Sequence, residues 1–264
     1  MERTETQPRR GLIAGVVALT AVIGLAASTP PRAVADETLD ARTLLDAVDD
    51  IYRGQQAYAE IEMSVKTEHW SRTLRIESWS HGTDKSLMRI LSPRKEKGTS
   101  TLRSGKDIWN YLPKVKRVIK LPSSMMSSSW MGSHFTNDDL VKESRFTEDF
   151  DFKISFRGKR DGKDVIDISC LPKRNAAVVW GKVVVTVLAD GYMPVKSLYY
   201  DEDMKLARTM TFSGIKQFGT RKLPSVMLIV PADKPKESTR VRYLKLDFDR
   251  DIPDSTFSLR ALRR

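Results

Sequence analysis

Hydrophobic residues recur at helical spacing in one long segment of this chain, between residues 39 and 56. The apolar residues that share one face of this segment are Leu44, Leu45, Val48, Ile51 and Tyr52. The pattern predicts an amphipathic helix with its acidic side chains turned to solvent. We expect Thr38 to cap the helix and Gly54 to end it.

Beyond this helix the spacing changes to two, which is typical of strands with one buried and one solvated face. The clearest alternation falls in residues 59–65, 150–156 and 244–248. The strongest hairpin signals are Asp161-Gly162 and Asp190-Gly191, and weaker ones are Ser104-Gly105 and His81-Gly82. These features predict an α+β, mainly β, fold in which a curved open sheet surrounds an apolar cavity. We find neither an internal repeat nor a linker, so residues 36–264 are expected to form a single domain.

The first 35 residues have the pattern of an export signal. Arg3, Arg9 and Arg10 precede an uncharged stretch over residues 11–27, and Ala33-Val34-Ala35 has the small-x-small pattern of a cleavage site. We therefore expect a signal peptide that is removed after Ala35, and a periplasmic protein. An uncleaved membrane anchor is the alternative, although the apolar stretch is short for a span. The paired arginines also fit a loose twin-arginine signal, so the export route stays open.

Cysteine content and charge narrow the possible partners. Cys170 is the only cysteine, which excludes an intramolecular disulfide and a metal site built on cysteines. Because Cys170 is in phase with Ile166 and Ile168, we expect it to be buried. The formal net charge of +11 favours an anionic partner. Export argues against nucleic acid, which leaves lipid headgroups, an acidic protein, or merely a solvated basic face.

Candidate catalytic and metal-binding residues are few. The three histidines, His69, His81 and His134, are far apart and lack metal-ligand spacing. The chain also lacks a P-loop, a G-x-S-x-G motif and a G-x-G-x-x-G motif. We therefore expect neither an enzyme nor a bound cofactor or metal. His134 is interpreted either as a pH-sensitive contact or as a polar loop residue.

Residues 98–143 carry the most specific pattern. A short aromatic strand at residues 108–113 precedes a loop, residues 122–133, that is dense in serine, methionine and glycine. Thr136 and Asp139 then form a capping box that predicts a short helix. Flexible backbone with methionine side chains suits a surface that accepts irregular apolar ligands. An inert connection whose methionines pack in the core is the alternative.

Two stretches of the chain carry a family pattern. The first is Trp109-x-Tyr111-x-Pro113, a basic run, Met125 and Met131-Gly132-Ser133-x-Phe135-Thr136-x-x-Asp139-Leu140, and the second is Asp251-Ile252-Pro253-Asp254-Ser255-x-Phe257-Ser258-Leu259. They resemble the outer-membrane lipoprotein-sorting protein family, which belongs to the LolA-like superfamily of periplasmic lipoprotein carriers. The likeness extends from about residue 50 to the end of the chain. His134 departs from the acidic residue that the family often has there.

This resemblance implies an unclosed antiparallel β-barrel with a few helices covering an apolar cavity for acyl chains. The implied partners are a lipid or the acyl chains of a lipoprotein, with an inner-membrane transporter or an outer-membrane acceptor, beside an export pump in some members. We expect a monomer. The residues that we predict to contact the ligand or form a lid are Trp109, Tyr111, Met125, Met126, Trp130, Met131 and Phe135. Ordinary core packing is the alternative for each of them.

Three functions are therefore open at this point. The first is a periplasmic carrier of a lipid or lipoprotein, whose affinity comes from burying an acyl chain. The second is a periplasmic sensor or adaptor on the same scaffold, which regulates a membrane partner. The third is an enzyme that uses the cavity as a substrate pocket, which would need convergent polar groups that the sequence does not show.

Overall fold

The computed structural model describes residues 40–264, except residues 53, 83, 143–148, 177 and 249. The signal peptide predicted for residues 1–35 lies outside the described residues. The described residues form one antiparallel sheet, two α-helices and four 3₁₀ turns. No helix in this part of the chain is both long and apolar enough to cross a membrane.

The sheet has thirteen strands, which follow the chain in two meanders. The first meander comprises β1 (Gln56–Lys66), β2 (Ser71–His81), β3 (Lys85–Ser92), β4 (Ser100–Ser104), β5 (Asp107–Leu112) and β6 (Arg117–Lys120). The second comprises β7 (Phe150–Arg160), β8 (Lys163–Pro172), β9 (Lys182–Leu188), β10 (Pro194–Tyr200), β11 (Leu206–Phe218), β12 (Arg221–Pro231) and β13 (Ser238–Asp247).

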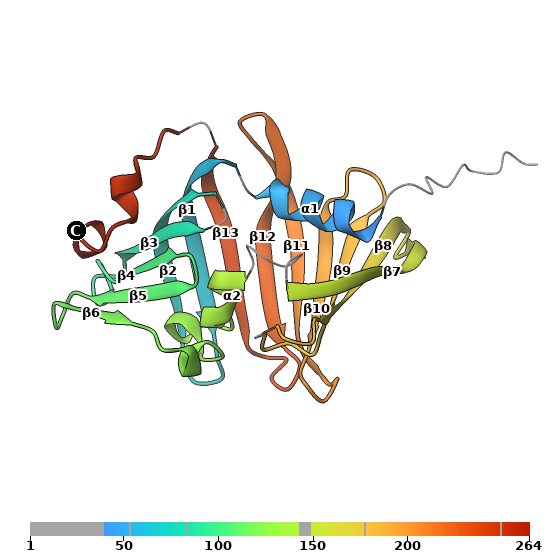
Figure 1. The fold of residues 1–264 in the computed structure, drawn as a ribbon, viewed down its shortest axis with the longest axis horizontal. Helices are drawn as coiled ribbons and strands as arrows, with labels where there is room; N and C mark the ends of the chain where they lie inside the picture. Colours follow the sequence, from blue (N-terminus) through green and yellow to red (C-terminus); the bar gives the residue numbers. More distant parts are fainter. Residues whose placement is uncertain (1–39, 53, 83, 143–148, 177, 249) are drawn as a thin grey trace, which may run out of the picture. The chain divides into compact units, whose positions relative to one another are not determined.

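The two meanders meet where β1 pairs with β13, so that Met63 lies opposite Val241. From this seam the strand order runs outward to β6 at one edge of the described sheet and to β7 at the other. The sheet curves without closing (Figure 1), and the predicted unclosed antiparallel barrel is confirmed. Because β6 and β7 are opposite edges, the connection between them must cross the sheet.

The hairpin signals of the sequence lie where the chain turns. Asp161 and Gly162 join β7 to β8 with φ angles of 50° and 75°, the left-handed pair that a tight two-residue hairpin requires. Asp190-Gly191 lies between β9 and β10, and Gly105 follows Ser104, the last residue of β4, in the turn that leads to β5. Local turn chemistry thus accounts for much of the meander.

Strict alternation fails at β-bulges. The register of β7 against β8 shifts between Ile154 and Phe156, which places Phe156 opposite Asp167. The expected continuation of the inward face to Phe156 is therefore wrong, because the extra residue in the strand reverses the side-chain phase. On the outer face, the guanidinium of Arg160 lies 4.1 Å from the centre of the Phe156 ring.

The predicted first helix is present as α1 (Ala41–Ile51), shorter than expected at both ends. Asp40, and not Thr38, is its cap, because the Asp40 carboxylate accepts a hydrogen bond of 2.7 Å from the Thr43 amide. Its apolar face joins an inner-face cluster with β7, β8 and β9 that includes Leu44 and Ile168. Cys170 belongs to this cluster and is fully buried, as predicted.

The larger inner-face cluster lies over β1–β3 and β10–β13. Its buried members are Ala59, Ile61, Met63, Val65, Leu74, Ile76, Ile90, Met210, Phe218, Leu223, Met227, Ile229, Val241 and Leu246, joined by Trp130 and Phe135 from the connection between β6 and β7. We call this set the inner cluster. Both α1 and α2 (Asn137–Lys142) lie on this side of the sheet (Figure 1).

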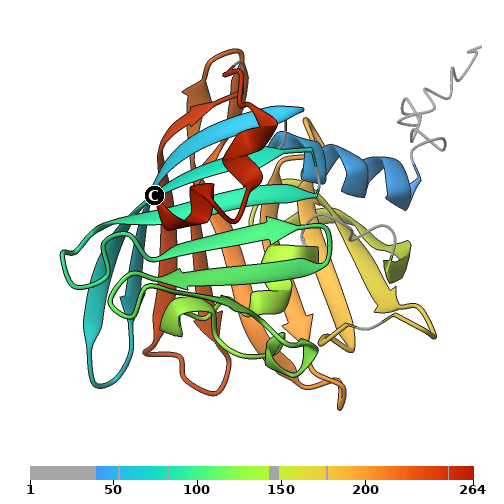
Figure 2. The ribbon, with the colours of Figure 1, turned by 60° about the vertical axis from the view of Figure 1, so that its left-hand side comes forward.

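A separate cluster covers the outer face of β1–β5. It contains Tyr58, Leu87 and Leu102, and the C-terminal segment adds Phe257 and Leu262. Figure 2 shows the 3₁₀ turns η3 (Asp254–Phe257) and η4 (Ala261–Arg263) packed against these strands. The C-terminal family pattern therefore serves to cover the outer face.

Candidate functional site

Residues 122–142 form a strap that crosses the inner face of the sheet. The strap contains η1 (Ser123–Met125), η2 (Trp130–Gly132) and α2. Met131 and Gly132 have φ angles of 49° and 62°, so the chain turns sharply through two successive left-handed residues. The turn brings Phe135 back beside Trp130, whose amide donates a hydrogen bond of 2.7 Å to the Phe135 carbonyl.

The predicted capping box is present at the start of α2. The Thr136 amide donates a hydrogen bond of 2.7 Å to the Asp139 carboxylate, and the Asp139 amide donates one of 3.1 Å to the Thr136 hydroxyl. These reciprocal bonds satisfy amides that a helix leaves open at its beginning. They also hold the Asp139 side chain in one place.

Trp130 and Phe135 carry the strap into the inner cluster. Their exposed fractions are 5% and 8%, and Met131 and Leu140 pack beside them with partial burial. The Trp130 indole nitrogen donates a hydrogen bond of 3.2 Å to the hydroxyl of Thr101 on β4. A buried indole N–H is thereby satisfied, which lets the ring enter an otherwise apolar region.

A cavity of about 80 Å³ remains between the strap and the sheet. The described residues that line it are apolar or aromatic: Ile61, Met63, Ile76, Met88, Trp130, Phe135, Leu140, Met227, Val241 and Tyr243. Pockets for small-molecule ligands usually measure roughly 300–1,000 Å³. The cavity is thus too small for an acyl chain while Trp130 and Phe135 are in place.

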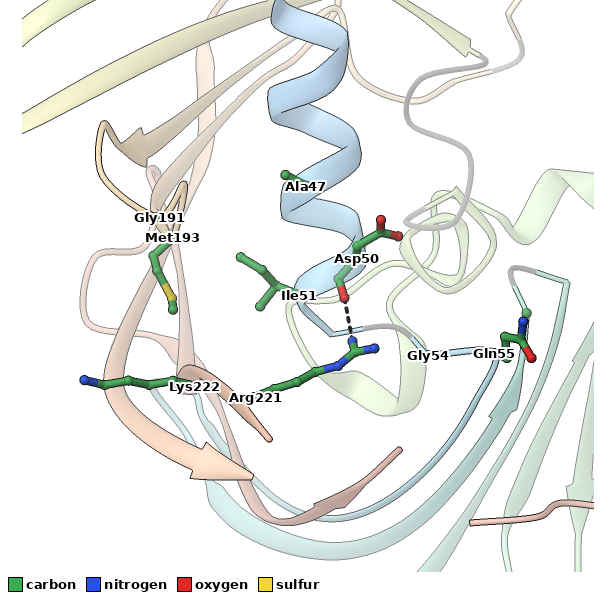
Figure 3. Close-up of a pocket in the computed structure, with 10 residues that line it drawn as sticks. Ala47, Asp50, Ile51, Gly54, Gln55, Gly191, Met193, Arg221 and Lys222 are labelled. Atoms are coloured by element: carbon green, nitrogen blue, oxygen red, sulfur yellow. Dashed lines mark hydrogen bonds between the residues drawn. The ribbon is translucent and has the colours of Figure 1, made fainter. Parts of the chain in front are cut away.

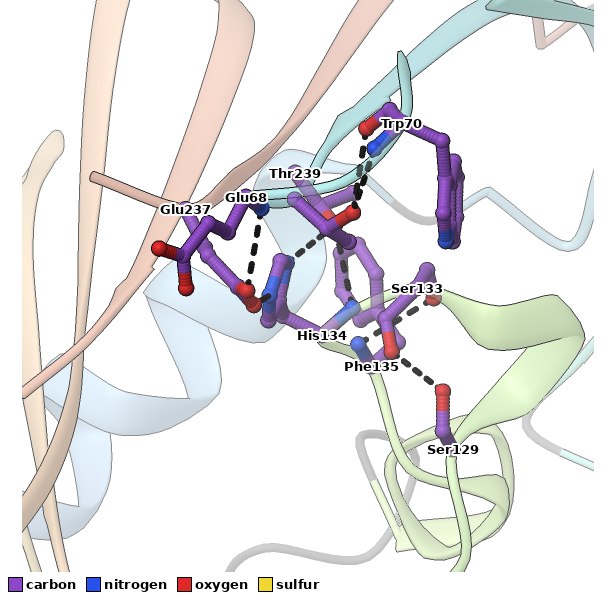
Figure 4. A network of polar contacts seen from close by, with 9 residues as sticks. Glu68, Trp70, Ser129, Ser133, His134, Phe135, Glu237 and Thr239 are labelled. Carbon is purple, nitrogen blue, oxygen red and sulfur yellow. Dashed lines mark hydrogen bonds and ion pairs between the residues drawn. The ribbon is translucent and has the colours of Figure 1, made fainter. Parts of the chain in front are cut away.

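Polar contacts fasten the middle of the strap to β13 and to the loop before it (Figure 4). The Thr239 hydroxyl lies 3.0 Å from the His134 amide and 2.8 Å from the His134 ring nitrogen Nδ1. The other ring nitrogen, Nε2, lies 3.2 Å from the Glu237 carboxylate. The Glu237 carboxylate also accepts a hydrogen bond from the Glu68 amide in the loop between β1 and β2.

The contacts of Glu237 favour its charged form. The hydrogen bond from the Glu68 amide is the largest cause that lowers the pKa of the Glu237 carboxyl, and the His134 side chain lowers it further. The fastening of the strap at His134 therefore involves a carboxylate that stays ionised to lower pH than usual.

An ion pair between Arg208 and Asp139 lies at the other end of the strap. Arg208 of β11 faces the inner side, and its two terminal nitrogens donate hydrogen bonds of 2.7 Å to the two oxygens of Asp139. It also donates to the backbone carbonyl of His134 at 2.9 Å. The guanidinium lies over the rings of Tyr199 and Trp180, at 4.2 Å and 4.4 Å from their centres.

The predicted ligand-contacting residues do not all lie in one place. Trp130 and Phe135 belong to the inner cluster, and Met131 packs against it. Met126 packs with Ile108 and Leu121 at the β5–β6 edge, while Met125 on the strap is 42% exposed. Trp109 and Tyr111 belong to the outer-face cluster, on the side of the sheet away from the strap.

An open pocket of about 850 Å³ lies beside the end of α1 (Figure 3). Ile51 of α1 lines it and also packs against the inner cluster, so the pocket adjoins that cluster. At its margin, Arg221 donates a hydrogen bond of 2.8 Å to the Asp50 carbonyl, and Lys222 is exposed. This pocket has the volume that the cavity under the strap lacks.

Within the part of the chain that the structure describes, no group of three or more histidine, cysteine, aspartate or glutamate side chains is placed to hold a metal ion. The groups that converge on the inner face are instead apolar side chains, and the Arg208 guanidinium and the Thr239 hydroxyl lie at their border. Such an arrangement can bind an apolar or amphiphilic molecule.

The fold and its apolar inner face define a LolA-like half-barrel. Residues 82–264 match the model of a DUF1329-like family, described as "Uncharacterized protein". Because the match spans more than half of the chain, the chain belongs to this family. No curated protein sequence matches the chain significantly.

Three solved structures share the fold. An outer membrane lipoprotein-sorting protein domain from Vibrio parahaemolyticus is 26% identical, with a TM-score of 0.73 over 84% of this chain and 97% of its own. A LolA superfamily protein from Nitrosomonas europaea is 21% identical, with a TM-score of 0.72 over 84% and 99%. A DUF1329 family protein from Desulfovibrio piger is 22% identical, with a TM-score of 0.75 over 83% and 96%. The predicted resemblance is confirmed.

Sequence reasoning missed the residues that fasten the strap from the sheet. Thr101, Arg208 and Thr239 come from strands far from the strap in sequence, and no local motif marks them. A signal for Arg208 did exist, because it stands in phase with the inward residues Met210 and Phe212 of β11. An arginine at an inward position requires an anionic partner.

Proposed function

We propose that this protein is a non-enzymatic periplasmic carrier that binds a lipid, or the acyl chains of a lipoprotein, on the inner face beneath the strap. The observation that carries this proposal is the apolar and aromatic lining that the described residues give to the cavity between Trp130, Phe135 and the sheet. The family pattern, the export signal and the LolA-like fold of its relatives support the same function.

Binding requires the strap to move, because its own side chains fill the site. An acyl chain of sixteen carbons can contribute about 10 kcal/mol through burial, at about 0.8 kcal/mol per methylene, before ordering costs. Displacing Trp130 and Phe135 from the inner cluster removes a similar kind of apolar contact. Loss of each buried ring costs about 3–5 kcal/mol, so the gain and the cost are of the same order, which suits a carrier that must release its ligand.

The partners follow from this function. A carrier in the periplasm receives its ligand from an inner-membrane transporter and delivers it to an outer-membrane acceptor, or works beside an export pump. We propose that the open pocket beside α1 admits the chain, because Ile51 lies both in that pocket and against the inner cluster. Its basic margin at Arg221 and Lys222 suits an approach to anionic lipid surfaces.

Native mass spectrometry of protein purified from a bacterial periplasm, followed by lipid extraction, tests this function. We expect bound lipid, and uptake of added fatty acid by protein from which lipid has been removed. Met88→Gln places an amide in the cavity with little change in side-chain length, and it should weaken uptake strongly. Met125→Gln is the matched control, since Met125 is on the exposed side of the strap. Equal uptake by both variants contradicts the proposed site.

A sensor or adaptor function is the second candidate. It is favoured by the edge strand β6 and the turn before it, where Ile119 of the strand and Val115 of the turn are 43% and 58% exposed beside a run of basic residues. An exposed strand edge with apolar side chains can pair with another protein. A persistent protein complex that contains no lipid would support this function over the carrier.

A further inference from the structure

We propose that Arg208 is the receptor for the anionic headgroup of the ligand, so that the protein prefers amphiphiles with a carboxylate or phosphate head. This inference rests on the proposed function and specifies its ligand class. In the closed arrangement, the Asp139 carboxylate on the strap occupies the place of that headgroup.

The position of Arg208 is the first argument. Its side chain is 5% exposed, although an arginine keeps its charge at any pH at which the protein is folded. A buried cation is costly unless an anion and hydrogen bonds compensate it. The rings of Tyr199 on β10 and Trp180 in the loop before β9 lie against the guanidinium, and neither ring belongs to the strap.

The second argument is that the anion leaves together with the strap. Asp139 lies in the same segment as Trp130 and Phe135, which fill the inner cluster. Displacement of the strap by an acyl chain therefore removes the carboxylate from Arg208 as well. A ligand that brings its own anion restores the two parallel hydrogen bonds, a geometry that carboxylate and phosphate both satisfy.

The third argument is the neighbourhood of the ion pair. Leu140, the residue after Asp139, lines the apolar cavity. Tyr199 packs against the inner cluster while its ring lies beside Arg208. An anion in the place of the Asp139 carboxylate thus has apolar surface next to it, which is the arrangement that an amphiphile requires.

The test compares ligands with one chain and different heads. Binding of palmitate, hexadecyl phosphate and the neutral hexadecanol is measured by displacement of a fluorescent fatty acid, with inorganic phosphate and acetate as heads without a chain. We expect the charged amphiphiles to bind at least about tenfold more tightly than hexadecanol. Inorganic phosphate and acetate alone should not compete.

Variants separate a headgroup receptor from a mere anchor of the strap. Asp139→Asn keeps an oxygen that can accept the Thr136 hydrogen bond but removes the charge on the strap. It should raise the affinity for charged and neutral amphiphiles by the same factor. The ratio of the two affinities should stay unchanged, because Arg208 is still present to bind a charged head. The double variant Arg208→Gln/Asp139→Asn should bind all three amphiphiles, and its affinities for palmitate and hexadecyl phosphate should be about equal to its affinity for hexadecanol. Lys159→Gln, which removes an exposed cation of β7 away from the strap and from the pocket beside α1, should keep the preference.

Four results would overturn the inference. Equal affinity for charged and neutral heads in the unmodified protein, with binding intact, refutes the receptor while the carrier function stands. A preference that survives in Arg208→Gln/Asp139→Asn places the headgroup elsewhere. Competition by inorganic phosphate at the affinity of hexadecyl phosphate indicates a site for free anions. Failure of every amphiphile to bind refutes the carrier function itself, together with this inference.

Discussion

The indole nitrogen of Trp130 lies 3.2 Å from the hydroxyl oxygen of Thr101 and donates a hydrogen bond to it. This bond joins the strap to β4, while His134 joins it to β13 and Asp139 joins it to β11. The strap is therefore fastened to strands of both meanders. These three contacts are polar and the space between them is apolar, and the proposed function requires that they break while the sheet stays folded.

Replacing Trp130 tests how tightly the strap is held. Trp130→Phe keeps an aromatic ring but loses the bond to Thr101, and we expect it to lower the free energy of unfolding by about 1 kcal/mol. Trp130→Ala also removes the buried ring and should cost about 3–5 kcal/mol. Urea unfolding followed by circular dichroism measures both. Equal losses in the two variants would show that the ring contributes nothing beyond its hydrogen bond.

Phe135→Ala should enlarge the cavity beneath the strap. We expect a loss of about 3–5 kcal/mol in unfolding free energy together with tighter binding of an apolar fluorescent probe, because space that the ring filled becomes available. Phe257→Ala is a matched control, since both rings are 8% exposed but Phe257 lies on the outer face. It should lose similar stability without a gain in probe binding. A gain in both variants would indicate general loosening.

Acidification should weaken the fastening at His134. The pKa of Glu237 lies below its usual value of 4.5, so Glu237 stabilises the folded state fully above about pH 4.5. This contribution is lost as the pH falls through the lower pKa of the folded protein. Between about pH 7 and about pH 3.5, the unmodified protein should therefore lose more unfolding free energy than Glu237→Gln. Parallel pH profiles of the two proteins would contradict this assignment.

The two strap methionines should respond differently to a charge. Met126 packs with Ile108 and Leu121, so Met126→Asp should lower the free energy of unfolding by about 2 kcal/mol or more. Met125 is 42% exposed, and Met125→Asp should change it by less than about 0.5 kcal/mol. Thermal unfolding of both variants provides the measurement. A large loss for Met125→Asp would mean that η1 is packed more deeply than its exposure indicates.

Much of the sheet could be predicted from local patterns. Alternation located strands such as β1, and Asp161-Gly162 located a hairpin, because both signals act between neighbouring residues. The bulge before Phe156 could not be predicted, since it depends on the register against β8. The cap of α1 is Asp40 and not the predicted Thr38, because a periodic pattern locates a helix but does not fix its first residue.

The candidate site was predictable only where residues on one segment act together. The strap and its capping box were recognised, and Trp130 and Phe135 do enter the inner cluster. Trp109 faces the other side of the sheet because its partner in the register is Leu102, which belongs to the outer-face cluster. Which face a strand residue occupies depends on pairing across the whole sheet, and a single sequence does not contain that information for so short a strand.

The most direct test of the central claim is to lock the strap onto the sheet. His134→Cys and Thr239→Cys, in a Cys170→Ala background, place two thiols where the side chains now touch at 2.8 Å. Uptake of a fluorescent fatty acid is then measured before and after reduction. If the strap covers the lipid site, the oxidised protein takes up no ligand and reduction restores uptake. Undiminished uptake by the oxidised protein would contradict a site beneath the strap.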